Sequence, residues 1–75
     1  MTKHIETRRK LCELDVSSLK NLFELIPLAE IDRRILELRY IKRHDFGFIA
    51  DELGFSESTV KRRHKEVLSR IQRHL

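Results

Sequence analysis

A glycine between two amphipathic runs constrains the fold of this chain more than any other feature. Within "DELGFSESTVKRR", residues 51–63, a helix-like run ends at Gly54 and a second run begins at Ser56. Glycine adopts the left-handed conformation of a helix C′ residue without steric cost, and serine is a favoured N-cap residue. The sequence therefore predicts two helices joined by a very short turn.

The residues on both sides of this turn have the spacing of a helix-turn-helix. Asp45 is a good N-cap for the first helix, and Phe55 is expected to fill the corner between the two helices. Ala50 is small, as a close crossing of two helices requires, and Gly54 follows four residues later. The predicted framework of the motif consists of Asp45, Ile49, Ala50, Leu53, Gly54 and Val60.

The second helix of this pair carries the positive charge of the chain. The formal net charge is +4, and residues 57–75 hold six Lys/Arg against two Asp/Glu. The predicted apolar stripe of this helix consists of Val60, Val67, Leu68, Ile71 and Leu75. The side chains expected to face away from it are Ser58, Lys61, Arg62, Lys65 and Ser69. A solvated helix face is the commoner reason for such a charge run, whereas the functional interpretation is a surface that binds a polyanion.

The remainder of the chain is expected to be helical as well. One proline and two glycines occur in 75 residues, and no segment alternates apolar and polar residues for long enough to form a strand. Helices are predicted over about 3–14, from the caps in "DVSS" to residue 26, and over about 29–42. The fold class is therefore all-α. We expect a small helical bundle of four to five helices with a C-terminal helix-turn-helix, in a single domain of residues 1–75.

The helix predicted over 29–42 has apolar residues on two sides. Ile31, Ile35 and Leu38 share one face of it. Leu36 and Tyr40 lie towards the other side. A helix with two apolar faces is expected to contact neighbours on both.

His64 lies in the middle of the apolar stripe of the last helix. We interpret it as a partly buried histidine bonded to a backbone carbonyl or a carboxylate, and the alternative is a pH-sensitive contact or a partner interface. The four histidines lack the HxxxH or HExxH spacing of a metal site, and the single cysteine, Cys12, has no CxxC partner. We therefore expect no metal and no cofactor. Because no Gly-rich phosphate loop and no evident carboxylate pair occur, we do not expect an enzyme.

The N-terminus, "MTKHIETRRK", lacks the apolar core of a signal peptide. No apolar run approaches the ~20 residues of a membrane span. A single cysteine suits a reducing compartment. The expected location is the cytoplasm of a bacterial or phage-infected bacterial cell, with no membrane contact.

Residues 33–71, "RRILELRYIKRHDFGFIADELGFSESTVKRRHKEVLSRI", resemble the C-terminal DNA-binding region 4 of bacterial sigma factors. That family commonly shows the pattern RxxLxLRY, then IAxxLG, then SxxTVK and a basic amphipathic helix. Here Ile49 and Ala50 follow Tyr40 at the family's spacing. The "SESTVK" stretch is equally similar to the output domains of LuxR-type response regulators. The resemblance covers about residues 26–75.

The resemblance implies a helical DNA-binding domain in residues 27–75. Its recognition helix would lie at about 57–74 and enter the major groove of double-stranded DNA. The side chains that match DNA-facing positions of the family are Ser58, Lys61, Arg62 and Lys65. The complete predicted set of DNA-binding residues is Ser56, Glu57, Ser58, Thr59, Lys61, Arg62, Lys65 and Arg43.

The chain also departs from both families. It has no room for the sigma regions that bind the −10 element and the polymerase clamp, and it ends where LuxR-type domains usually continue into a further helix. Where many relatives have a glycine after the LRY motif, this chain has "IKRHD". We expect a stand-alone, sequence-specific transcription regulator, similar to small regulators of phages and mobile elements. The alternative is a protein-interaction module that binds RNA polymerase or a sigma/anti-sigma partner.

Residues 1–26 form an N-terminal helical segment outside the resemblance, and we interpret it as a dimerisation or partner-binding element. Its apolar residues exceed what one helix needs to cover a core, namely Leu11, Leu14, Leu19, Leu22 and Phe23. One helix-turn-helix reads too few base pairs to find a site in a genome. We therefore expect a homodimer formed through this segment or the end of the last helix, with docking on RNA polymerase as the other source of specificity.

Overall fold

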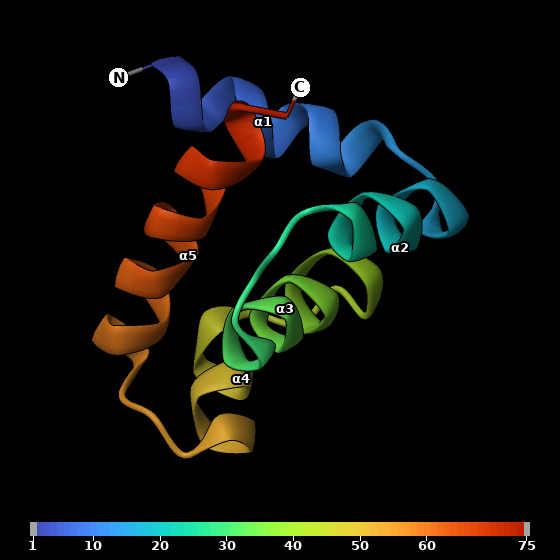
Figure 1. The fold of residues 1–75 in the computed structure, drawn as a ribbon. Helices are drawn as coiled ribbons and strands as arrows, with labels where there is room; N and C mark the ends of the chain where they lie inside the picture. The colour runs from blue at the N-terminus through green and yellow to red at the C-terminus, as the bar shows by residue number, and fades with distance from the viewer. Residues whose placement is uncertain (1, 75) are drawn as a thin grey trace.

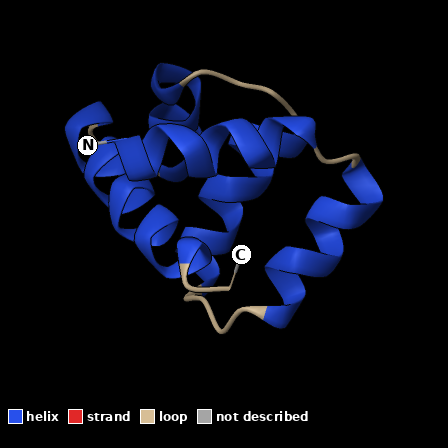
Figure 2. Cartoon of the chain, turned by 90° about the horizontal axis from the view of Figure 1, so that it is seen from above, coloured by secondary structure: helices blue, strands red, loops and turns tan. Residues whose placement is uncertain are grey.

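The computed structural model describes residues 2–74, with the side chains of residues 5–74, and every regular element in this range is helical (Figures 1 and 2). The elements are α1 (Thr2–Glu13), α2 (Val16–Leu25), α3 (Glu30–Leu36), the π-helical turn η1 (Glu37–Ile41), α4 (Phe46–Leu53) and α5 (Glu57–Gln72). Short loops join them (Figure 2). The prediction of an all-α bundle with a C-terminal helix-turn-helix is confirmed.

Three side-chain caps determine where helices begin. The Asp15 carboxylate caps α2 by accepting a hydrogen bond from a first-turn amide. The Asp45 carboxylate accepts one from the Phe48 amide at 2.8 Å, and the Ser56 hydroxyl accepts one from the Thr59 amide at 3.2 Å. Such a cap satisfies a backbone donor that has no partner within the helix and typically stabilises it by about 1 kcal/mol.

The segment formed by α3 and η1 contacts neighbours on two sides, as its sequence predicts. Leu36 and Tyr40 are buried in a core cluster shared with α1, α2 and α5. Ile35 is buried in a second cluster with residues of α4 and α5, and Leu38 packs against that cluster. This segment therefore connects the N-terminal helices to the helix-turn-helix.

The turn η1 is wider than the regular helix that the sequence predicts over 29–42. The Lys42 amide donates to the Glu37 carbonyl, five residues earlier, at 3.0 Å. After this turn the backbone reaches Arg43, whose φ of 62° is the left-handed value that ends the helical run. The period of the apolar residues does not reveal such a bulge, because one extra residue in a turn leaves the pattern nearly unchanged.

The larger core cluster joins the N-terminal segment to the last helix. Its buried members are Leu11, Leu19, Phe23, Ile26, Leu36, Tyr40, Val67, Leu68 and Ile71. Leu14 and Leu22 pack against it while half-buried. Figure 1 shows α1 crossing the C-terminal end of α5, and the two helices are in contact. The apolar residues predicted to be in excess therefore pack in or against the core of a single chain, so this premise of the dimer prediction is wrong.

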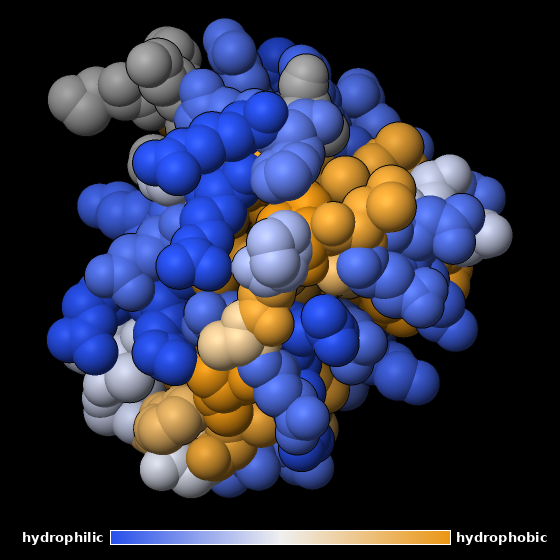
Figure 3. Space-filling model, viewed as in Figure 1, coloured by the Kyte–Doolittle hydropathy of each residue, from blue (hydrophilic) through white to orange (hydrophobic). Residues whose placement is uncertain are grey.

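Apolar surface remains exposed at a few positions. The large apolar side chains that are exposed are Ile5, Val16, Leu25, Phe48 and Phe55. Figure 3 shows hydrophilic side chains gathered over α5, with apolar side chains in the middle of the same view. Within the described residues, no helix combines the length and the apolar character that crossing a membrane requires.

Candidate nucleic-acid interface

The turn between α4 and α5 is built on a left-handed glycine. Gly54 has φ 74° and ψ 29°, and its amide donates to the Ala50 carbonyl. The Phe55 amide donates to the same carbonyl at 2.9 Å. These bonds satisfy a carbonyl group at the end of α4 and direct the chain into the next helix within a few residues.

A compact apolar cluster holds the two helices of the motif together. It consists of Ile35, Ile49, Ala50 and Val60, all buried. Leu53 and Phe46 pack against it from the sides. Because Val60 docks α5 against α4 and α3, the opposite face of the first turns of α5 is held outward. The structure thus places the predicted framework residues in the turn, the caps and this cluster.

Phe55 does not fill the corner between the helices, which corrects the prediction. Its side chain is 38% exposed. The corner is closed instead by the backbone bond from Phe55 to Ala50 and by the half-buried side chain of Leu53.

Replacement of Gly54 by valine should lower the free energy of unfolding by about 1–2 kcal/mol, because a β-branched residue is strained at positive φ. A Cβ atom on Gly54 would meet no atom within 4 Å, so backbone strain is the only expected cost. Urea unfolding measures the effect. Gly54→Asn is the matched control and should lose much less, because asparagine tolerates this conformation. Equal losses in the two variants would contradict the assignment.

The outward face of α5 carries most of the side chains that the sequence assigns to DNA. The exposed ones are Ser56, Glu57, Ser58, Lys61, Arg62 and Lys65, while Thr59 is half-buried. Lys61 Nζ lies 3.1 Å from a Glu57 carboxylate oxygen, and about half of each side chain is exposed. Such an exposed ion pair contributes little, so an anion can compete for Lys61 at small cost.

Arg63 differs from its basic neighbours because it serves the fold. Its Nε lies 3.3 Å from the Asp32 carboxylate on α3, and both side chains are half-buried. The pair fixes the side of α5 that faces α3. The positive charge available to a ligand in this turn therefore comes from Lys61, Arg62 and Lys65 on the other sides of the helix.

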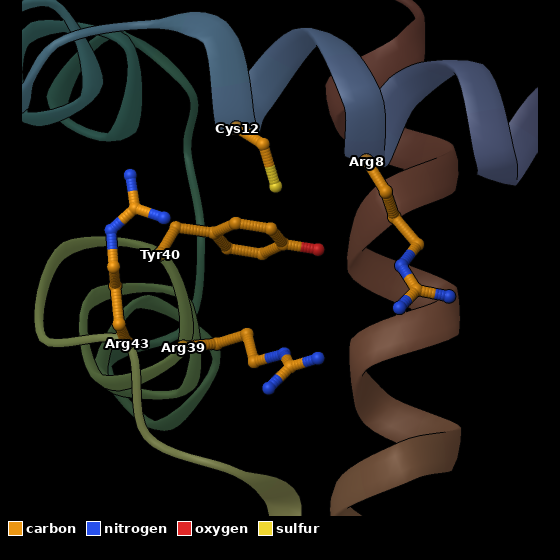
Figure 4. A pocket seen from close by; sticks show the side chains of 5 residues that line it. All are labelled: Arg8, Cys12, Arg39, Tyr40 and Arg43. Carbon is orange, nitrogen blue, oxygen red and sulfur yellow. The ribbon is translucent and has the colours of Figure 1, made fainter.

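Arg43 stands apart from the residues on α5. It lies on the loop after η1, where it is exposed and has φ 62°. It lines a hollow together with Arg8, Cys12, Arg39 and Tyr40 (Figure 4). Arg8 belongs to α1, outside the sequence resemblance, and sequence reasoning did not assign a role to Arg8 or Arg39. No local pattern connects residues so far apart in the sequence.

His64 is buried and hydrogen-bonded, and one of its partners is a residue that the sequence does not suggest. Its side chain is 4% exposed, and its Nε2 lies 2.6 Å from the Tyr40 hydroxyl. The Phe46 ring meets the imidazole edge-on with the ring centroids 4.9 Å apart. Burial raises the pKa of Tyr40 to about 12, so the phenol stays neutral. The Tyr40 phenol is a partner that the sequence does not suggest, and the predicted bond to a carbonyl or a carboxylate stays a prediction.

The profile of the family described as Sigma-70, region 4, matches residues 27–73, well over half of the chain. The chain belongs to the sigma-70 region 4 family. Region 4 is a DNA-binding helix-turn-helix domain, and the matched range contains the whole motif of α4 and α5. No curated protein and no solved structure matches the chain.

The region 4 match begins after α2, so α1 and α2 lie outside it. These two helices nevertheless share the larger core with α5. In this chain an N-terminal pair of helices thus packs against the last helix of the region 4 motif. In the part of the chain that the structure describes, no group of three or more His, Cys, Asp or Glu could hold a metal ion.

Proposed function

We propose that this region 4 domain is a sequence-specific transcription regulator that binds double-stranded DNA with the N-terminal half of α5 in the major groove. One observation carries the proposal. The exposed Ser58, Lys61, Arg62 and Lys65 share a face of α5 that the framework cluster holds outward. A helix fits the major groove of B-DNA, and its first turns meet base edges there.

The chemistry of this face suits both the backbone and the bases of DNA. Arg62 has no hydrogen bond or ion pair with another described residue, so its guanidinium is available to a ligand. Arginine binds the O6 and N7 atoms of guanine with two parallel hydrogen bonds. Ser58 offers a hydroxyl to phosphate or base, and Lys65 offers a positive charge to phosphate. With 16 residues, α5 is roughly 24 Å long, enough to follow the groove.

Arg62→Ala is the variant that tests this function. We expect the melting temperature to stay nearly unchanged, because Arg62 is exposed and unpaired. DNA binding should weaken by about 1–3 kcal/mol on the preferred sequence if Arg62 reads a base, and uniformly across sequences if Arg62 binds phosphate. Fluorescence anisotropy against a panel of genomic fragments distinguishes these two losses of affinity, and thermal unfolding followed by circular dichroism gives the melting temperature. A melting temperature that falls together with affinity would contradict the assignment of Arg62 as a reader.

A second candidate function is docking on RNA polymerase or on a sigma/anti-sigma partner. It is supported by two exposed aromatic side chains, Phe48 on α4 at 43% and Phe55 in the turn at 38%. Exposed aromatic residues are typical of protein interfaces. A complex held by these rings would depend little on salt, whereas DNA binding depends on it strongly. A homodimer remains a prediction that sedimentation equilibrium tests.

A further inference from the structure

A hollow of about 180 Å³ opens between α1, η1 and the loop that follows η1. Figure 4 shows the side chains that line it, namely Arg8, Cys12, Arg39, Tyr40 and Arg43. Three of these five are arginines and none is a carboxylate. We infer that this hollow binds a phosphate group. The inference deepens the proposed function, because the backbone of bound DNA is one source of that phosphate and a free phosphate ion is the other.

Arg39 is held in place without losing its charge. Its Nη1 donates to the His44 carbonyl at 3.0 Å, and its guanidinium carbon lies 4.5 Å from the centre of the Phe46 ring. Both contacts orient the guanidinium, and neither neutralises it. The remaining N–H donors of such a fixed guanidinium can form the paired hydrogen bonds that phosphate oxygens accept.

Tyr40 forms a neutral wall of the hollow. Burial raises its pKa to about 12, while the nearby charges of Arg8 and Arg39 only partly oppose this shift. Its hydroxyl is engaged with His64 of α5 at 2.6 Å. The phenol therefore brings no negative charge to the arginines, and among the described residues no ion pair joins Arg8, Arg39 or Arg43 to a carboxylate.

Arg43 occupies a backbone position that favours glycine. It is the one non-glycine residue with positive φ in the described range, at 62°. Glycine adopts this conformation without strain, whereas arginine does not. A long cationic side chain at a strained position, beside two further arginines, is consistent with a use for its guanidinium rather than with a need of the turn.

A chain of contacts connects the hollow to the recognition face. Arg39 stacks on Phe46, the first residue of α4. The next residue, Gly47, lies so close to Glu57 that a Cβ atom on it would stand 3.1 Å from the carboxylate. Glu57 in turn pairs with Lys61. These contacts join the segment that carries Arg39 to the first turns of α5. On this inference, a DNA strand whose bases meet α5 places a backbone phosphate at the arginines.

Arg8→Gln tests the inference on DNA, with Arg9→Gln as the matched control. The two arginines are adjacent on α1 and both exposed, but only Arg8 lines the hollow. Because three arginines share one phosphate, the loss of Arg8 should make the slope of log K against log salt shallower by a fraction of the roughly 0.9 that a whole phosphate contact contributes. Arg9→Gln should leave the slope nearly unchanged. Circular dichroism confirms that both variants keep their helices.

Inorganic phosphate provides the second arm, measured without DNA. The arginine Nε–Hε signals in an NMR spectrum are followed while phosphate is added and chloride is removed to hold the ionic strength constant. If a free ion is the ligand, some of these signals should shift and saturate, and the shifts should disappear in Arg8→Gln and Arg43→Gly. Arg43→Gly should in addition raise the melting temperature, because it relieves the left-handed arginine.

The outcomes distinguish a DNA phosphate from a free phosphate ion as the ligand. They also distinguish a failure of phosphate binding in the hollow from a failure of the proposed DNA-binding function. A shallower slope without a response to the free ion supports a DNA phosphate, and a saturable response supports a free phosphate. The inference is overturned if Arg8→Gln matches Arg9→Gln on DNA and no saturable shift occurs. If Arg62→Ala still weakens DNA binding in that case, the proposed function stands. If the domain binds no DNA at all, the proposed function fails, and the phosphate titration alone tests whether the hollow binds phosphate.

Discussion

Binding of this domain to a DNA duplex should weaken by more than a hundredfold, roughly 150- to 250-fold, when monovalent salt rises from 50 to 200 mM. The estimate rests on about four phosphate contacts, which release about four counterions and give a slope of log K against log salt of roughly −4. The residues expected to make them are Lys61, Arg62, Lys65 and Arg43. Arg70 is a weaker candidate, because its guanidinium donates to the Pro27 carbonyl at 3.4 Å.

Anisotropy titrations at four or five salt concentrations, against both random and genomic duplexes, measure this slope. Lys61→Gln combined with Lys65→Gln should make it shallower by about 2, because each lysine accounts for roughly one released counterion. Ser69→Ala is a suitable control, since it leaves the charge of α5 unchanged and its hydroxyl bonds only to the Lys65 carbonyl. A slope near zero, or the absence of binding at 50 mM salt, would rule out DNA as the partner.

The helix-turn-helix could be predicted from sequence because its determinants are local. The Asp45 and Ser56 caps act on amides three residues away, and Gly54 sets the turn through its own backbone angles. Such interactions involve residues only a few positions apart, so the order of residues in the sequence predicts them. The apolar stripe of α5 is equally local, and Val60, Val67, Leu68 and Ile71 are buried at the predicted spacing. Leu75, the last predicted member of the stripe, lies outside the described residues.

The features that could not be predicted depend on contacts between distant segments. The Tyr40–His64 bond joins residues 24 positions apart, and Tyr40 itself lies in the π-helical turn that the sequence does not reveal. The hollow brings Arg8 of α1 beside Arg39 and Arg43 only because α1 packs across the end of α5. Residue spacing gives the face of a helix but not the neighbour that it meets.

The role of the N-terminal segment shows the same limit. Its leucines and Phe23 could cover a core or form a dimer, and composition does not distinguish these uses, since either buries the same apolar area. The structure places Leu11, Leu19 and Phe23 at 0–2% exposure within the core of one chain. A dimer would therefore have to use other surface, such as the exposed Ile5 or Leu25.

Leu11→Ala should lower the free energy of unfolding by about 2–5 kcal/mol, because it removes a fully buried leucine and leaves a cavity among the residues that α1 shares with α5. A domain of 75 residues is expected to have only roughly 4–11 kcal/mol in total, so the variant should lose a large share of its stability. Ile5→Ala is the matched control on the same helix: Ile5 is 56% exposed, so we expect a change within about 0.5 kcal/mol. Urea titrations followed by circular dichroism compare the two. If Leu11→Ala is as mild as Ile5→Ala, α1 is dispensable to the fold and its buried face must serve a partner instead.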